Sequence, residues 1–245
     1  DKFAPYSFKV VREKTKQLGQ EYTPHKGEYL LKYARTGIVM ALQTTLPRGG
    51  RVGVVAYNCY TVANAIVQGG CTPVFIDVTP DLHINTDAII GTQLDAIVVT
   101  NLFGIRNDIE QIRQALPNAI IIVDNAHGYG LPAEGDFTVY SINQGKFPSL
   151  GEGGVLWVNN IQYQDAIEQQ CSQLKEYSLT AEIKLFISML LKAWMHTPLI
   201  YGMITLPMKR NRKGGSCRER VVMKRMAKGV SRMYQAALRT IDEQI

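Results

Sequence analysis

Cysteine is scarce in this chain, and the few present form no recognisable metal or disulfide pattern. The 245 residues contain four cysteines, Cys59, Cys71, Cys171 and Cys217, with no CxxC pair and no metal-ligand spacing. A chain of this length can bury a substantial core without covalent cross-links. We therefore expect reduced thiols, a cytoplasmic protein and no metal site.

Two other patterns are missing. No secretory signal peptide is visible. No GxGxxG run follows the first strand-like segment at residues 51–56, which argues against a dinucleotide-binding enzyme.

Acidic residues become scarce in the last third of the chain. Through Asn160 there are 13 basic and 14 acidic residues, and the remainder holds 14 basic and 7 acidic. Most of this surplus lies in residues 209–213 and 218–232. Such a surplus of basic residues can indicate a protein that binds nucleic acid, an acidic membrane surface or a phosphorylated substrate. It can also simply reflect a solvated helix face and loop. The solvated face is the favoured interpretation, and we expect no nucleic-acid partner.

One long apolar stretch, residues 186–206, is long enough to cross a membrane. Lys192, His196 and the helix-breaking Pro198 argue against spanning. Contact with a membrane surface stays open as the less favoured alternative. The favoured interpretation is packing against a sheet or a second subunit.

The first two-thirds of the chain alternates strand-length apolar runs with helical spacing. The runs are residues 51–56, 72–77, 96–100, 120–123, 137–142 and 155–158, and helical spacing occupies residues 61–68 and 107–116. This pattern predicts an α/β fold with a three-layer, mainly parallel sheet flanked by helices. Ligands bind beyond the carboxyl ends of such strands, where Tyr57, Asn101 and Asp124 fall.

Lys146 and Asp124 together indicate pyridoxal phosphate chemistry. Lys146 follows the strand-like run that ends in Tyr140-Ser141 and precedes Gly151-Glu152-Gly153-Gly154, and Asp124 ends a separate apolar run. A lysine can form a Schiff base with the cofactor aldehyde, and an aspartate can keep the pyridine nitrogen protonated. Either residue alone would mean little, but the pair in this order is informative.

The chain resembles the DegT/DnrJ/EryC1/StrS family of sugar aminotransferases, pyridoxal phosphate enzymes of fold type I. Asp124-Asn125-Ala126-His127 stands where the family usually has Asp-Ala-Ala-Gln, and Thr100-Asn101-Leu102-Phe103-Gly104 where it has a His-Leu-Tyr-Gly type run. The other matching segments are residues 33–42, 56–66, 70–78 and 140–154. The resemblance runs from about residue 29 to 160 and resumes near residue 225.

The resemblance implies a phosphate-binding group formed by Thr36, Gly37 and Ser141. Thr36 and Gly37 would open a helix, whose free N–H groups and positive dipole end attract a phosphate. An ordinary helix cap is the alternative for Thr36. Gly37 would allow close approach, and Ser141 would add a hydroxyl donor.

It also implies contacts to the cofactor ring. Asp124 would form a charge-assisted hydrogen bond to the ring nitrogen, and His127 would lie near the phenolic oxygen, unless it is a satisfied core histidine. Tyr57 and Tyr60 are both candidates to stack on the ring. By this resemblance, Cys59 stands at the position expected for an aromatic residue.

The implied activity is transfer of an amino group from glutamate or glutamine to a nucleotide-linked keto sugar, by a homodimer. Lys146 argues against the family's dehydratase offshoot, which has histidine there. A non-catalytic relative that serves as a binding or scaffolding subunit is the alternative. We expect a pyridoxal-phosphate-binding large domain at residues 1–205, and a basic linker and helix at residues 206–245. These would lead to a small C-terminal domain, so we expect the natural protein to extend beyond Ile245.

Overall fold

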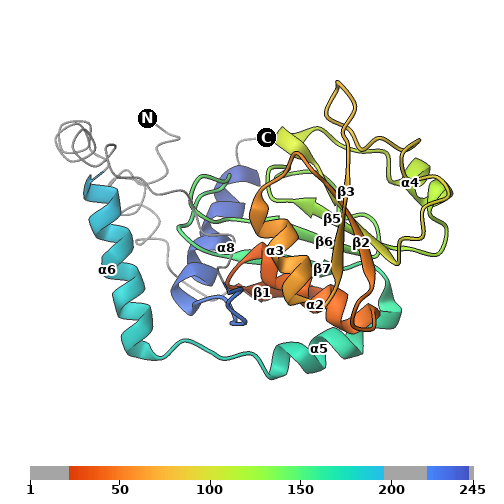
Figure 1. Cartoon of the computed structure of the whole chain (residues 1–245). Coiled ribbons are helices and arrows are strands. Elements are labelled where there is room, and N and C mark those ends of the chain that lie inside the picture. The colour runs from red at the N-terminus through yellow and green to blue at the C-terminus, as the bar shows by residue number, and fades with distance from the viewer. Residues whose placement is uncertain (1–21, 196–219, 243–245) are drawn as a thin grey trace.

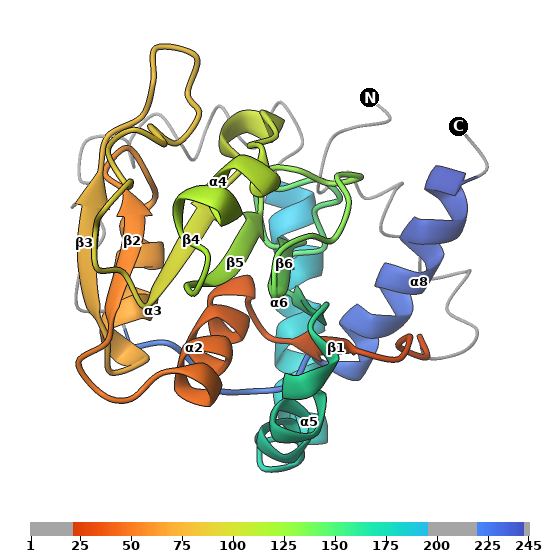
Figure 2. The ribbon, with the colours of Figure 1, turned by 90° about the vertical axis from the view of Figure 1, so that its right-hand side faces the viewer.

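The computed structural model describes residues 22–195 and 220–242, and a seven-stranded sheet forms its centre. The strands run in the order β1-β7-β6-β5-β4-β2-β3, and Figure 2 shows the β3, β2, β4, β5 and β6 part of this order side by side. Their bounds are β1 Glu28–Leu31, β2 Arg51–Val55, β3 Thr72–Ile76, β4 Ala96–Thr100, β5 Ile120–Asn125, β6 Phe137–Ser141 and β7 Gly154–Val158.

Five neighbouring strands are parallel, and the other two form an antiparallel edge. Strands β6, β5, β4, β2 and β3 pair in parallel, whereas β7 pairs antiparallel with both β6 and β1. The β2–β4 pairing is the point at which strand order reverses along the chain. The predicted mainly parallel α/β fold is therefore confirmed.

Helices cover both faces of the sheet, which completes three layers (Figure 1). Helices α2 (Ala34–Thr45), α3 (Tyr60–Gln68) and α5 (Gln164–Ser172) pack on one face in a shared apolar cluster. Helix α4 (Ile109–Ala115) covers the other face beside β4 and β5. Helix α8 (Lys228–Asp242) covers the same face near β7, and α6 (Leu179–Met195) packs against α8. Two 3₁₀ turns, Leu102–Gly104 and Ile161–Tyr163, complete the elements.

The predicted strands all form, with ends that differ by one or two residues. The Val- and Ile-rich runs of the inner parallel strands β4 and β5 are buried on both faces, whereas the edge strand β3 exposes Phe75. Strand β1 was not predicted, because its four residues, Glu28-Tyr29-Leu30-Leu31, carry no long apolar run. It forms through pairing with β7, more than 120 residues away in sequence.

The C-terminal helix packs its apolar face against the rest of the chain. Helix α8 starts at Lys228, whose backbone N–H donates to Glu182 Oε1 at 2.8 Å, while Lys224 and Arg225 form isolated bridges to neighbouring segments. Its apolar face, Val230, Met233 and Ala237, is buried beneath the sheet. The apolar face of this helix therefore has its packing partner within the described part of the chain.

Parts of two other expectations fall outside the described residues. The predicted domain boundary at residues 205/206 lies there, as does the second half of the apolar stretch 186–206, since α6 ends at Met195. Within the residues that the structure describes, no helix has the length and apolarity to cross a membrane.

The start of α2 lies directly against β7, and this close approach generates a prediction. A Cβ added at Gly154 would overlap the backbone of Ala34. Gly154→Ala should lower the free energy of unfolding by roughly 3 kcal/mol, because backbone on both sides must shift. Urea unfolding measures this.

Gly229→Ala is the matched control, since a Cβ at Gly229 in α8 meets no atom within 4 Å. This variant should be unchanged or slightly stabilised, as alanine is the better helix former. Equal stability of the two variants would contradict the close packing of α2 on β7.

Candidate active site

A cleft of about 460 Å³ lies at the carboxyl edge of the sheet, beside the point where strand order reverses. Its walls come from the residues that follow β2 and β4, from the ends of β5 and β6, and from the start of α2. Five of the predicted site residues line it: Tyr57, Asp124, His127, Ser141 and Lys146. Parallel strands bring these segments together because their carboxyl ends share one edge.

Asp124 is a buried carboxyl group at the end of β5. It is 3% exposed, and its Oδ1 accepts a hydrogen bond from the Ala126 backbone N–H at 3.0 Å. Burial raises its pKa above the ordinary value, against the opposing effects of the Ala126 N–H, Lys146 and Thr100. A buried carboxylate of this kind favours a ligand that brings a positive charge or a proton.

Lys146 is a half-buried amine in the loop after β6. A turn in which its N–H donates to Asn143 O at 3.1 Å holds its backbone. Burial lowers the pKa of Lys146, although the nearby Asp124 and Cys59 oppose this. A larger fraction of the amine is therefore neutral, which is the nucleophilic form.

His127 lies at the mouth of the same cleft. Partial burial and the positive charge of Lys146 both lower its pKa, so the imidazole is neutral at neutral pH. The Phe103 ring lies beside it, with ring centroids 5.9 Å apart. His127 is an exposed residue of the cleft wall and not a core histidine.

A buried amide network holds the loop that carries His127. Asn125 accepts a hydrogen bond from Asn101 Nδ2 at 2.6 Å and donates one to Pro132 O at 3.2 Å. Asn101 Oδ1 in turn accepts from the N–H of Asn107 at 2.9 Å. Asn101 is 1% exposed, so this residue, which falls at a strand end, supports the cleft wall instead of lining it.

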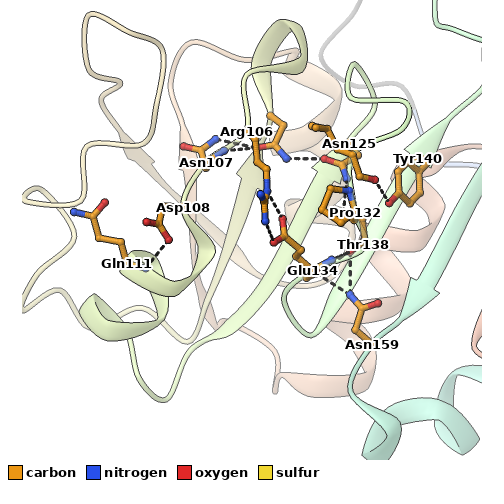
Figure 3. Close-up of polar contacts among 12 residues, drawn as sticks. Arg106, Asn107, Asp108, Gln111, Asn125, Pro132, Glu134, Thr138, Tyr140 and Asn159 are labelled. Atoms are coloured by element: carbon orange, nitrogen blue, oxygen red, sulfur yellow. Dashed lines mark hydrogen bonds and ion pairs between the residues drawn. The ribbon is translucent and has the colours of Figure 1, made fainter. Parts of the chain in front are cut away.

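The other end of this loop is tied to the sheet by Glu134 (Figure 3). Its side chain pairs with Arg106, and its backbone N–H donates to Thr138 Oγ1 at 2.8 Å. Asn159 donates to both Glu134 O and Thr138 Oγ1. Residues 126–134 are therefore fixed at both ends, which positions His127 relative to Asp124.

Thr36 and Gly37 do not open the helix, contrary to the sequence prediction. Helix α2 begins at Ala34, and the Thr36 hydroxyl is fully buried and donates to Val222 O at 3.1 Å. A Cβ at Gly37 would lie 2.9 Å from Val139 Cγ1, so glycine here lets α2 approach β6. The residues of the helix start that line the cleft are Tyr33, Ala34 and Arg35.

The structure distinguishes the two tyrosines. Tyr57 lines the cleft, whereas Tyr60, the first residue of α3, is not among its lining residues. Cys59 also lines it, and its Sγ lies 3.1 Å from Thr61 Oγ1.

Sequence reasoning missed several polar lining residues. Arg35 adds a guanidinium at the start of α2, and Asn143 adds an amide beside Lys146. Thr100 ends β4 directly opposite Asp124 in register and accepts from Asn58 Nδ2 at 2.8 Å. The strand-end rule that selected Asp124 would also have found Thr100, but no local signal distinguishes Arg35 or Asn143.

The chain matches the DegT/DnrJ/EryC1/StrS aminotransferase family over residues 34–189, well over half its length. It belongs to this family. Pyridoxal 5'-phosphate is the cofactor of DegT/DnrJ/EryC1/StrS aminotransferases, and the predicted cofactor is thereby confirmed.

Solved structures share the fold at low identity. An aminotransferase from Psychrobacter cryohalolentis is 19% identical, with a TM-score of 0.63 over 88% of this chain and 52% of its own. DesI, solved in the presence of its TDP-sugar product, is 19% identical, with a TM-score of 0.62 over 96% and 54%. A putative sugar aminotransferase from Streptococcus pneumoniae is 15% identical, with a TM-score of 0.65 over 96% and 64%. The chain thus spans about half to two-thirds of these proteins.

The residues of the cleft fit the cofactor of the DegT/DnrJ/EryC1/StrS family. The volume of about 460 Å³ lies within the usual range for small-molecule sites. The cleft combines a half-buried amine, a buried carboxyl group and, at the start of α2, backbone N–H groups beside Arg35. These groups suit an aldehyde, a pyridine nitrogen and a phosphate respectively.

Because Asp124 is buried, we expect its charge to lower the stability of the cofactor-free protein while it strengthens cofactor binding. A carboxyl group whose pKa is raised by folding contributes stability below its unfolded pKa and loses it as the pH rises through the raised value. Asp124→Asn keeps the Oδ1 acceptor for Ala126 but removes the charge. The cofactor-free variant should therefore be more stable than wild type at neutral pH, by about 1–2 kcal/mol, while binding the cofactor more weakly.

Urea unfolding of both cofactor-free proteins from about pH 4 to pH 8 measures this effect. The two curves should converge at the acid end and separate towards neutral pH. A variant that is less stable at every pH would show that Asp124 is held mainly by structural contacts.

Proposed function

We propose that this protein is a pyridoxal-phosphate-dependent aminotransferase that transfers an amino group from glutamate or glutamine to a keto sugar carried on a nucleotide. The observation that carries this proposal is that Lys146 and Asp124 line one cleft, although Asp124 lies in β5 and Lys146 in the loop after β6. Membership of an aminotransferase family supports the reaction class. The cytoplasm, where nucleotide-linked sugars are made, is the compartment we infer.

Lys146 would supply both the attachment point for the cofactor and the base that moves a proton. When bound, pyridoxal phosphate supplies an aldehyde that captures amines and a ring that accepts electrons. The Lys146 amine is half-buried and shifted towards its neutral form. Once the substrate amine has displaced Lys146 from the cofactor, the Lys146 Nζ can take a proton from the substrate carbon. It can then deliver this proton to a carbon of the cofactor.

Asp124 and His127 orient the ring between them. The Asp124 carboxylate would accept a hydrogen bond from a protonated ring nitrogen, which compensates the unfavourable burial of its charge. Neutral His127 can donate one N–H to an oxygen at the cleft mouth. Tyr57 is the candidate to cover a ring face, because it lines the cleft and Tyr60 does not.

The phosphate end is assigned to Ser141 and the start of α2. Ser141 ends β6 inside the cleft, and the first N–H groups of α2, at Ala34 and Arg35, lie at the positive end of the helix dipole. Arg35 adds a full positive charge. Thr36 and Gly37 would serve this group indirectly, because Thr36 ties α2 to the backbone at Val222 and Gly37 lets α2 pack closely on β6.

The substrate is inferred from relatives. DesI, which has this fold, was solved with a TDP-sugar product, and a nucleotide-linked sugar is therefore the proposed acceptor. A non-catalytic binding subunit is the alternative, but the retained lysine and buried carboxylate favour an enzyme. We infer a homodimer, because closed two-fold assemblies are the commonest soluble oligomers.

Borohydride reduction of the protein mixed with pyridoxal phosphate tests the cofactor site. A single adduct should appear on the peptide that contains Lys146, and Lys146→Ala should lose it and all transamination. Lys26→Ala, which removes an exposed lysine, is the matched control and should keep both. An adduct that persists in Lys146→Ala would refute the assignment.

The assembly is tested separately by light scattering of the protein at micromolar concentration. We expect twice the 27.4 kDa chain mass. A monomer that binds the cofactor and transaminates would contradict the proposed dimer.

A further inference from the structure

Glu152 is a buried acid near the end of the loop that carries Lys146. This loop, which we call the lysine loop, covers residues 142–153 between β6 and β7, and Glu152 is 6% exposed. Its Oε1 accepts a hydrogen bond from the Tyr177 hydroxyl at 2.5 Å, and its Oε2 lies 3.5 Å from Lys32 Nζ. A buried carboxylate is tolerated when it is paired and hydrogen-bonded, as it is here. Glu152 therefore joins the lysine loop to two other segments of the chain.

Tyr177 is a well-held donor to this carboxylate. Two cations lie over its ring, with Lys32 Nζ 5.2 Å and Lys224 Nζ 4.4 Å from the ring centroid. Burial and the hydrogen bond to Glu152 raise the pKa of Tyr177, so its hydroxyl stays protonated and continues to donate. Hydrogen bonds of this length to a carboxylate are about twice as strong as those between neutral groups.

The same carboxylate reaches the segment that enters α2. Lys32 precedes Tyr33, whose ring centroid lies 5.3 Å from Lys32 Nζ and 4.4 Å from the guanidinium carbon of Arg35. Tyr33 and Arg35 both line the cleft. The backbone of Tyr33 also forms a parallel bridge with Gly153, the residue after Glu152. The Glu152 carboxylate thus connects the lysine loop to the helix start that we assign to phosphate.

Several other contacts of the lysine loop lie within it or on the α8 side of the sheet. The Lys146 N–H donates to Asn143 O at 3.1 Å, and the Leu150 N–H donates to Ile142 O at 2.9 Å, so these hydrogen bonds close inside the loop. Leu150 packs in the apolar cluster around α8, on the face of the sheet opposite α2. Glu152 adds the side-chain connection towards α2.

We propose that Glu152 is a positioning residue that fixes the lysine loop relative to the start of α2. This inference rests on the proposed function, in which Lys146 holds the aldehyde of the cofactor and the start of α2 holds its phosphate. The two ends of one rigid ligand must be met at once, so the separation of these segments matters. Movement of either segment would leave a buried charge unpaired, which is strongly unfavourable.

Hydrogen–deuterium exchange of the cofactor-free protein tests the coupling without any ligand. Glu152→Gln keeps the size of the side chain but removes its charge. Exchange should become about tenfold faster in residues 143–150 and 33–36 together, because both segments lose the same contact. Residues 126–134, which are fixed by separate hydrogen bonds, should exchange as in wild type.

Tyr177→Phe removes only a hydroxyl, and it gives the same test if Glu152→Gln does not fold. It should accelerate exchange in the same two segments. The acceleration in the double variant should be smaller than the product of the two single accelerations, because the two side chains act through one contact. Glu176→Gln is the matched control, since Glu176 precedes Tyr177 but forms an exposed pair with Arg225. This control should exchange like wild type in both segments.

A second measurement separates positioning from general stability. Pyridoxal lacks the phosphate of pyridoxal phosphate, so the ratio of their dissociation constants, measured by absorbance, reports how well both ends of the cofactor are met. Glu152→Gln should reduce the preference for pyridoxal phosphate by about tenfold, because the two segments are no longer aligned. A loss of overall stability would weaken the binding of both ligands alike.

Three outcomes would overturn the proposal. One is unchanged exchange in residues 143–150 and 33–36 of Glu152→Gln, and another is an equal acceleration in residues 126–134. The third is an equal loss of affinity for pyridoxal and pyridoxal phosphate. A wild type that binds no pyridoxal phosphate would refute the proposed function instead, and the exchange data would still decide whether Glu152 couples the two segments.

Discussion

The buried carboxyl group of Asp124 is the constraint on which the cleft depends. It sits at the end of a central strand with 3% of its surface exposed, where burial alone disfavours its charge. Only a ligand that brings a positive charge or a proton relieves this cost. In the proposed function this carboxylate accepts a hydrogen bond from a protonated ring nitrogen, and its burial lowers the stability of the cofactor-free protein.

The polar groups around Asp124 are hydrogen-bonded to one another, so the free-energy cost of burial is confined to the Asp124 carboxyl group. Asn101, Asn107 and Asn125 satisfy one another in the layer behind the cleft, and Glu134 and Thr138 fix the far end of the His127 loop. Buried polar groups that are fully paired make a rigid support. This rigid support keeps the Asp124 carboxylate and the loop that carries His127 in place before any ligand arrives, which lowers the entropy cost of binding.

The two C-terminal helices show how the same local pattern can have opposite outcomes. Both α6 and α8 carry apolar residues at helical spacing. In α8 they are buried against the sheet, whereas in α6 only Leu185 and Met189 are covered and an outer stripe remains exposed. Helix α8 is thus part of the hydrophobic core, whereas α6 keeps exposed aliphatic side chains on its outer face.

The sequence by itself determined the parallel strands and the pair of candidate catalytic residues, Lys146 and Asp124. Residues 96–100 and 120–123 are apolar on both faces, which only a buried parallel strand explains well, and the strand-end rule then selects Asp124. Lys146 was identifiable because its flanking residues form a specific motif. These features are local, and local features can be read from a chain.

Only the tertiary structure decided which neighbouring residues face the cleft. Thr36 lies inside the core because its hydroxyl reaches Val222, 186 residues later in the chain. Gly37 serves packing against Val139 in β6, and Tyr57 lines the cleft where Tyr60 does not. Strand β1 forms because its backbone pairs with β7 in antiparallel orientation. Each of these outcomes depends on contacts between distant segments, whose geometry is set by the assembled layers and is absent from any local pattern.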